Sequence, residues 1–247
     1  PYEKQIDKMA LDLGISYDNE KRIKSGIKYS LIRATYNGNS CVIKENLIEY
    51  VVSLLDVMKE NVEDGLTELR AEEEIVIEER DDGTGTWIYL SYFYNTEQEI
   101  AMRIERLQKS QNVKKIKNIE TQLKKLELNS NIELSEKQKE AIRQVNENNV
   151  TIITGGPGTG KTTIIKSIIE IYEQKGNKVV LCAPTGRAAK RMTETTGKEA
   201  STLHRLLEIG KIDENNFYQS ATSYEGAPID ADLIIVDELS MVDMFVM

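Results

Sequence analysis

A glycine-rich stretch that ends in a lysine and two threonines contains the residue types best suited to chemistry. Residues 155–162 match the spacing G-x-x-x-x-G-K-S/T of a phosphate-binding loop. Glycines let backbone N–H groups turn toward phosphate oxygens without a Cβ clash, and the positive end of the following helix attracts the same anion. We therefore expect ATP to bind at the following positions: Gly156, Pro157, Gly158, Thr159, Gly160, Lys161, Thr162 and Thr163.

The last residues of this loop have separate expected roles. The Lys161 ammonium would reach the β- and γ-phosphates, which makes it a candidate catalytic residue, and the Thr162 hydroxyl would hold Mg²⁺. The alternative is a glycine-rich turn that matches the pattern by chance. The context argues against chance, because an apolar predicted strand at Val150–Ile153 precedes the loop and an apolar helical pattern follows it.

A pair of acids behind an apolar run is the second candidate for chemistry. Leu233–Val236 is followed by Asp237 and Glu238, about 75 residues after the loop lysine. In an ATPase, the first acid binds Mg²⁺ through water and the second polarises the attacking water. Acids after a buried strand can also cap a helix, but their order behind a phosphate-binding loop favours catalytic roles for both and a metal-binding role for Asp237.

Two further segments lie where an α/β fold carries function. The apolar strand at residues 178–183 ends in Pro184–Arg187, and loops at the carboxyl ends of parallel strands are common functional positions. An ordinary strand-to-helix loop would look the same. Upstream, Ser135 predicts a helix start, and the amide of Gln138 suits the edge of an adenine, although a glutamine on a helix is usually just solvated.

The composition excludes several classes of protein. The 247 residues are 40% hydrophobic and 30% charged with a net charge of −9, as expected of a globular protein without a global basic footprint for nucleic acid. No apolar run approaches the roughly 18 residues of a membrane span. Cys41 and Cys182 match no metal spacing, which favours a reduced, cytoplasmic setting. The chain begins at Pro1 and stops at Met247 within an apolar pattern, so we expect a fragment of a longer protein.

The first 95 residues predict a helical domain with a β-hairpin. The expected helices lie within residues 4–36, 47–58 and 62–71, and the expected hairpin strands at 75–77 and 87–90. Three helices before a hairpin form a winged-helix pattern. Residues 60–82 hold eleven acidic and two basic side chains, which would repel phosphate, so a structural or protein-partner role is favoured over DNA binding.

A basic helical stretch at residues 96–130 follows the hairpin. Its lysines and arginines most simply form a solvated helix face, and a track for nucleic acid is the less favoured interpretation. The turn at residues 129–131 is the expected domain boundary.

Taken in order, these segments resemble the motifs of the RecD/TraA branch of superfamily 1 DNA helicases. Gly155–Thr162 is similar to motif I, Ala183–Ala189 to motif Ia, Thr202–Leu207 to motif Ib and Val236–Asp243 to motif II. Gln138 falls where that family has the glutamine of its Q-motif. The upstream part is similar to the N-terminal region of the longer, stand-alone RecD-like proteins.

The resemblance implies ATP-driven translocation along single-stranded DNA, 5′ to 3′, with duplex unwinding in DNA repair or recombination. It assigns phosphate and Mg²⁺ to Lys161 and Thr162, and the metal and water to Asp237 and Glu238. The positions that contact the DNA strand in the family correspond here to Pro184, Thr185, Gly186, Arg187, Thr202 and His204.

The expected fold class is therefore α/β. A winged-helix-like domain covers residues 1–95, a basic helical connector 96–130, and a partial RecA-like parallel-sheet ATPase domain 131–247. In the family, motif III, the second RecA-like domain and the arginine that completes the ATP site lie beyond Met247, so we expect this chain to bind nucleotide weakly and not to unwind DNA alone. Two alternatives stay open: a P-loop nucleotidase or kinase of another class, and a non-enzymatic module with a vestigial ATPase half.

Overall fold

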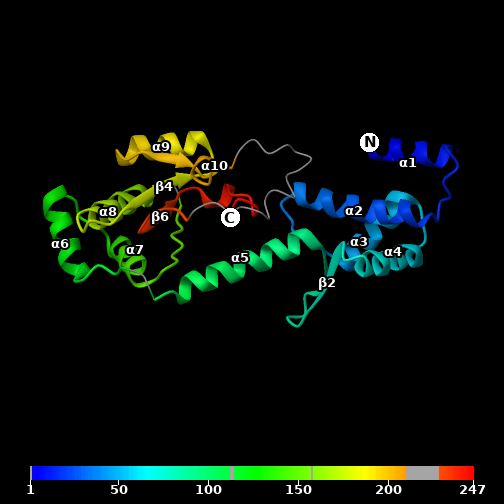
Figure 1. The fold of residues 1–247 in the computed structure, drawn as a ribbon, viewed down its shortest axis with the longest axis horizontal. Helices are drawn as coiled ribbons and strands as arrows, with labels where there is room; N and C mark the ends of the chain where they lie inside the picture. Colours follow the sequence, from blue (N-terminus) through cyan, green and yellow to red (C-terminus); the bar gives the residue numbers. More distant parts are fainter. Residues whose placement is uncertain (1, 112–113, 157, 210–227) are drawn as a thin grey trace. The chain divides into compact units, whose positions relative to one another are not determined.

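The chain folds into two compact units that share one helix. The computed structural model describes residues 2–111, 114–156, 158–209 and 228–247. One unit ends at Glu99 and the other begins at Ile100, so helix α5 (Ser91–Lys109) contributes to both. Figure 1 shows α5 as a single unbroken helix.

The first unit combines helices with a small antiparallel sheet. Its elements are α1 (Tyr2–Asp12), α2 (Glu20–Tyr36), β1 (Cys41–Ile43), α3 (Lys44–Leu55), α4 (Lys59–Ala71), β2 (Ile75–Arg80) and β3 (Gly85–Leu90). Strand β3 is central, and its Ile88 lies opposite Val42 of β1 and Ile77 of β2. The helices and the hairpin are confirmed. Strand β1 was not expected, because three residues are too few to show an alternating pattern.

The core of this unit lies where α2, α3 and α4 cover the sheet. Its most buried side chains include Ile27, Val51, Val62, Leu69 and Ile88. Two glycines let the helices approach one another. A Cβ on Gly26 would lie 2.6 Å from Leu55 Cδ1, and a Cβ on Gly65 would lie 2.9 Å from Ile23 Cγ2. A larger residue at either glycine would force the side chains packed against it to shift.

A buried arginine ties α1 to the rest of the unit. Arg22 is only 8% exposed, and its guanidinium donates two 2.7 Å hydrogen bonds to the carboxylate of Asp7. It also donates to the carbonyl oxygens of Tyr17 at 2.5 Å and Leu55 at 2.7 Å. A buried charge is stable only when it is paired and hydrogen-bonded, so this one cation fixes α1, the loop after it and the end of α3 together.

The second unit is built on a parallel sheet. Its further elements are α6 (Ile119–Ser130), α7 (Glu136–Glu147), α8 (Lys161–Glu173), β4 (Val179–Ala183), α9 (Gly186–Thr196), β5 (Ala200–Thr202), α10 (Leu203–Leu206), β6 (Leu233–Val236) and the 3₁₀ helix η2 (Leu239–Met241). The three strands are parallel, in the order β5-β4-β6. The mixed fold class expected from the sequence, with a short parallel sheet in the second half, is confirmed.

The core of the second unit includes residues from the stretch that precedes residue 131. Ile116, Leu123 and Leu126 are buried together with Ile142 of α7 and Leu181 of β4. The division of the chain into three regions stays a prediction. Among the described residues, no helix is both long and apolar enough to cross a membrane.

One expected strand is not a strand in the structure. Residues 151–156, which include most of the apolar run at Val150–Ile153, pair with no strand among the described residues, and Ile152 is 79% exposed. The short strand β5, not expected from the sequence, takes a place in the sheet instead. Strand β4 pairs with β5 on one side and with β6 on the other. An apolar run alone therefore does not decide which segment joins the sheet.

Candidate active site

The glycine-rich loop adopts a backbone that its glycines make possible. Gly158 has a φ of +76° and Gly160 a φ of +84°, in the left-handed region that residues with a Cβ rarely adopt. Gly160 is the N-cap of α8, so the first N–H groups of that helix have no side-chain cap at this position. Pro157 lies outside the described residues. A loop that ends at an uncapped helix start suits an anion.

The loop lysine folds back over its own loop. Lys161 Nζ donates hydrogen bonds to the carbonyl oxygens of Gly155 at 2.5 Å and Gly156 at 3.0 Å, and Thr159 Oγ1 donates to Gly156 at 2.9 Å. Thr162 is exposed and Thr163 half-buried at the start of α8. The Lys161 ammonium and the N–H groups at the start of α8 therefore belong to one short stretch. A cation next to N–H donors suits the binding of a polyphosphate.

Gln138 packs against this loop from α7. Its Oε1 accepts a 2.9 Å hydrogen bond from the Ser135 backbone N–H, and the Ser135 hydroxyl accepts from the Gln138 N–H at 3.4 Å, which forms a capping box. A Cβ on Gly160 would lie 2.2 Å from Gln138 Nε2. The side-chain oxygen is thus used within α7, while the amide nitrogen faces the loop.

The ends of the three parallel strands lie next to one another. Ala183 of β4 pairs with Thr202 of β5, and Cys182 pairs with Val236 of β6. Pro184 and Asp237, which follow their strands directly, are therefore brought to one edge of the sheet. The register joins motif segments that are far apart in the sequence, as expected for carboxyl ends of parallel strands.

Two threonines at this edge begin helices. Thr185 Oγ1 accepts from the Ala188 N–H and caps α9, and Thr202 Oγ1 accepts from the Arg205 N–H and caps α10, both at 3.2 Å. A hydroxyl that accepts one hydrogen bond still has its own proton to donate. Both hydroxyls therefore have a donor available for an anionic ligand.

The other candidate residues at this edge are accessible. Gly186, Arg187 and His204 are exposed, and Pro184 is half-buried. The exposed side chains leave a cation and an imidazole open to solvent beside the two capping threonines.

The two acids follow β6 in an unusual backbone. The Asp237 N–H donates to the Cys182 carbonyl at 3.0 Å and extends the strand pairing by one residue, and the Glu238 N–H donates to Asp237 Oδ1 at 2.9 Å. Glu238 has a φ of +56°. A left-handed non-glycine residue costs about 1–3 kcal/mol, a strain that clusters at functional sites. Asp237 is half-buried and Glu238 exposed.

The thiol beside Asp237 is not a candidate nucleophile. Burial raises the pKa of Cys182 to about 11, so the thiol stays protonated near neutral pH. Its Sγ donates weakly to the Ile235 carbonyl oxygen at 3.6 Å. Cys182 acts here as a packed strand residue.

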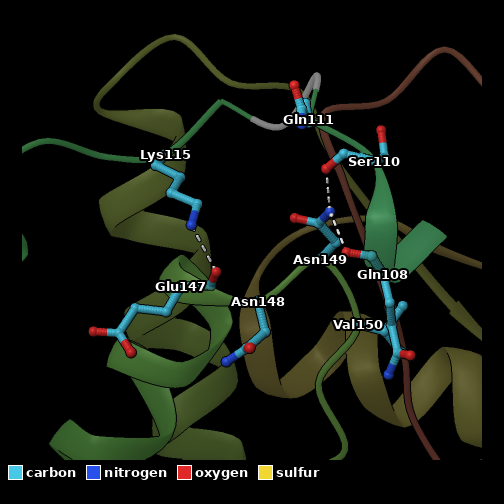
Figure 2. Close-up of a pocket in the computed structure, with 8 residues that line it drawn as sticks. All are labelled: Gln108, Ser110, Gln111, Lys115, Glu147, Asn148, Asn149 and Val150. Carbon is cyan, nitrogen blue, oxygen red and sulfur yellow. Dashed lines mark hydrogen bonds between the residues drawn. The ribbon is translucent and has the colours of Figure 1, made fainter. Parts of the chain in front are cut away.

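A polar pocket of about 430 Å³ lies away from all these positions (Figure 2). It lies between the end of α5 and the end of α7, and it is lined by Gln108, Ser110, Gln111, Lys115, Glu147, Asn148, Asn149 and Val150. None of them was a predicted site residue. Asparagines and glutamines near helix ends carry no sequence pattern that would have singled them out.

Part of the chain is similar in sequence to known proteins. Residues 138–247 match the family model described as an AAA domain. The chain is 44% identical over 108 residues to the ATP-dependent RecD2 DNA helicase of Deinococcus radiodurans, across 44% of this chain and 14% of that protein. It is 38% identical over 130 residues to the RecBCD enzyme subunit RecD of Buchnera aphidicola, across 44% of this chain and 21% of that protein. It is 33% identical over 132 residues to the RecBCD enzyme subunit RecD of Haemophilus influenzae, across 43% of this chain and 20% of that protein. The chain thus spans between 14% and 21% of the length of these relatives.

Proposed function

We propose, from the homology of residues 138–247 to superfamily 1 helicases of the RecD type, that this chain contributes the ATP-binding and strand-binding segments of an ATP-dependent DNA helicase. The observation that carries the proposal is the register of the parallel sheet. It brings Pro184, Thr202 and Asp237 to one edge, so the proposed DNA contacts and the proposed metal-binding acid share it.

The nucleotide would be held by the glycine-rich loop and the start of α8. Lys161 exchanges its carbonyl partners for phosphate oxygens, the N–H groups at the helix start bind the same anion, and the Gln138 amide contacts the base. Thr162 and Asp237 would hold Mg²⁺, and Glu238 would orient the attacking water. The metal supplies charge neutralisation on the phosphates when it is bound.

A single DNA strand would lie along the strand-end edge. The Thr185 and Thr202 hydroxyls donate to phosphate oxygens, and Arg187 and His204 contact the backbone from exposed positions. The net charge of −9 does not oppose this, because phosphate contacts are local and the edge carries its own cation. A DNA substrate is consistent with a cytoplasmic place of action. The proposed direction, 5′ to 3′, rests on the resemblance of the motifs.

Unwinding would require more than these residues. The chain spans 14% of the RecD2 relative, and we propose that the 247 residues bind nucleotide without separating duplex DNA. The acidic first unit, which holds residues 60–82, would bind a protein partner rather than DNA.

The test is ATP hydrolysis with and without single-stranded DNA, measured on a polypeptide that includes the remaining helicase segments. DNA should stimulate hydrolysis by at least tenfold, and Lys161→Ala should abolish it. Hydrolysis that does not respond to DNA would indicate a nucleotidase or kinase of another class. An absence of nucleotide binding would indicate the non-enzymatic module. Strand separation by the 247-residue chain alone would refute the proposed division of labour.

A further inference from the structure

The end of α5 is fastened to a residue just in front of the phosphate-binding loop. Asn149 Nδ2 donates to the carbonyl oxygens of Leu107 at 2.9 Å, Gln108 at 3.2 Å and Ser110 at 2.6 Å. Carbonyls in the last turn of a helix have no partner within the helix. Asn149 thus caps α5 from a position about 40 residues further along the chain, and Figure 2 shows this amide pointing at the helix end.

Two neighbours of Asn149 hold the residues that follow α5. The buried Asn146 accepts from the Ile116 N–H at 2.7 Å and donates to the Ile116 carbonyl at 3.1 Å, and Lys115 Nζ donates to the Glu147 carbonyl at 2.8 Å. We call Asn146, Glu147 and Asn149 the latch. All three bind backbone or side-chain groups from residues 107–116 of the chain.

The second half of α5 is largely exposed. Between Glu97 and Ser110, only Ile100 and Ile104 are not exposed. At the other end, Ser91 is fixed to the carbonyl oxygens of Glu74 at 3.0 Å and Glu73 at 2.5 Å. An exposed helical stretch gains little stability from packing, so the contacts at its ends add to the stability of α5.

The latch is also close in sequence to the candidate nucleotide site, with Thr151 and Ile153 as the further contacts between them. Beyond Asn149, residues 151–156 lack a strand partner, and the Thr151 hydroxyl donates to the Gln144 carbonyl of α7 at 3.2 Å. A segment outside a strand ladder shifts at lower cost than one within it. A change in the loop can therefore travel back along these few residues to the latch.

We propose that the latch couples nucleotide binding to the order of the end of α5 and of residues 114–116. This inference rests on the proposed nucleotide site. A phosphate that attracts Lys161 releases the carbonyls of Gly155 and Gly156, which alters the segment that begins at Asn149. Coupling between two sites is reciprocal, so a partner that restrains α5 changes nucleotide affinity by the same factor.

Hydrogen exchange of the 247-residue chain, with and without a saturating non-hydrolysable ATP analogue and Mg²⁺, tests the coupling. Nucleotide should change the exchange of amides 107–111 and 114–116 by at least threefold in the unmodified chain. Asn149→Ala and the isosteric Asn149→Asp remove the donor to α5 and should abolish that response. Because coupling is reciprocal, the nucleotide affinity of each variant should differ from that of the unmodified chain. The factor should equal the factor by which nucleotide changes amide exchange in the unmodified chain.

Asn148→Ala is the matched control. Asn148 is exposed, and among the described residues its side chain donates only to Gln144 in the last turn of α7, so this variant should keep the full response. Fluorescence titration of the nucleotide on each chain separates the possible failures. Nucleotide binding without a change at 107–116, or equal responses in the Asn148 and Asn149 variants, overturns the coupling alone. A chain that binds no nucleotide overturns the proposed function and the coupling together.

Discussion

A Cβ placed on Gly160 would lie 2.2 Å from Nε2 of Gln138, so the contact between the glycine-rich loop and the start of α7 leaves no room for a side chain at this position. A Cβ at this position would displace the amide, whose oxygen accepts the 2.9 Å bond from the Ser135 N–H. Gly160→Ala should therefore lose the capping box in addition to paying for an alanine at a φ of +84°. Each effect lowers the free energy of unfolding by about 1 kcal/mol, so we expect urea unfolding to show a total loss of about 2 kcal/mol. We also expect at least a tenfold loss of nucleotide affinity.

Gly176→Ala is the control for backbone strain. Gly176 has a φ of +75°, but no atom of the part of the chain that the structure describes lies within 4 Å of its hypothetical Cβ. The variant should therefore lose about 1 kcal/mol of stability, and its nucleotide affinity should not change. In a Gln138→Ala background, Gly160→Ala should cost less than in the unmodified chain. Equal costs in both backgrounds would show that the contact does not constrain the loop.

The buried Arg22 should be a main support of α1. Arg22→Met leaves the Asp7 carboxylate and two carbonyl oxygens without their donor, and breaking such a pair costs about 3–5 kcal/mol. Urea unfolding monitored by circular dichroism should show this loss. Lys59→Met removes an exposed lysine that lies 3.5 Å from Glu63, and it should change stability by less than about 0.5 kcal/mol. Similar losses in the two variants would contradict the structural role of Arg22.

Acid should weaken the join between α6 and α7 through Glu127. The Leu134 N–H and the Lys139 ammonium, both at 2.9 Å, lower the pKa of the Glu127 carboxyl. A carboxyl whose pKa is lower in the folded state than in the unfolded state stabilises the fold when it is ionised. This contribution is complete at a pH above the unfolded-state pKa, near 4.5, and is lost as the pH falls through the folded-state pKa. Glu127→Gln should therefore reduce the loss of stability as the pH falls below about 5.

The matched variant for this titration is Glu133→Gln, which removes an exposed carboxylate near the same turn. Its unfolding profile should keep the acid slope of the unmodified chain. An equally flat profile in both variants would attribute the slope to net charge rather than to the contacts of Glu127.

The sequence predicted features that depend on neighbouring residues and missed those that depend on distant pairing. The Ser135 cap and the helix after Gly160 follow from local residue types, and both are present. The apolar run before the loop fits the pattern of a strand, yet β4 pairs with β5 on one side and with β6 on the other. No local pattern shows which segments will pair. The contact between Asn146 and Ile116 spans 30 residues and leaves no periodic signal.

Arg187 offers the sharpest test of the strand-end edge as a DNA site. If its exposed guanidinium contacts a phosphate, Arg187→Ala should weaken binding of oligothymidylate severalfold at low salt. The slope of log K against log salt should fall in magnitude by about 0.7, the value for one phosphate contact on a single strand. Lys175→Ala removes an equal charge from the turn that precedes β4, at the opposite end of that strand, and should leave the slope unchanged. Fluorescence anisotropy at several salt concentrations measures both. An unchanged slope in Arg187→Ala would move the DNA contact away from this edge, because counterion release counts phosphate contacts directly.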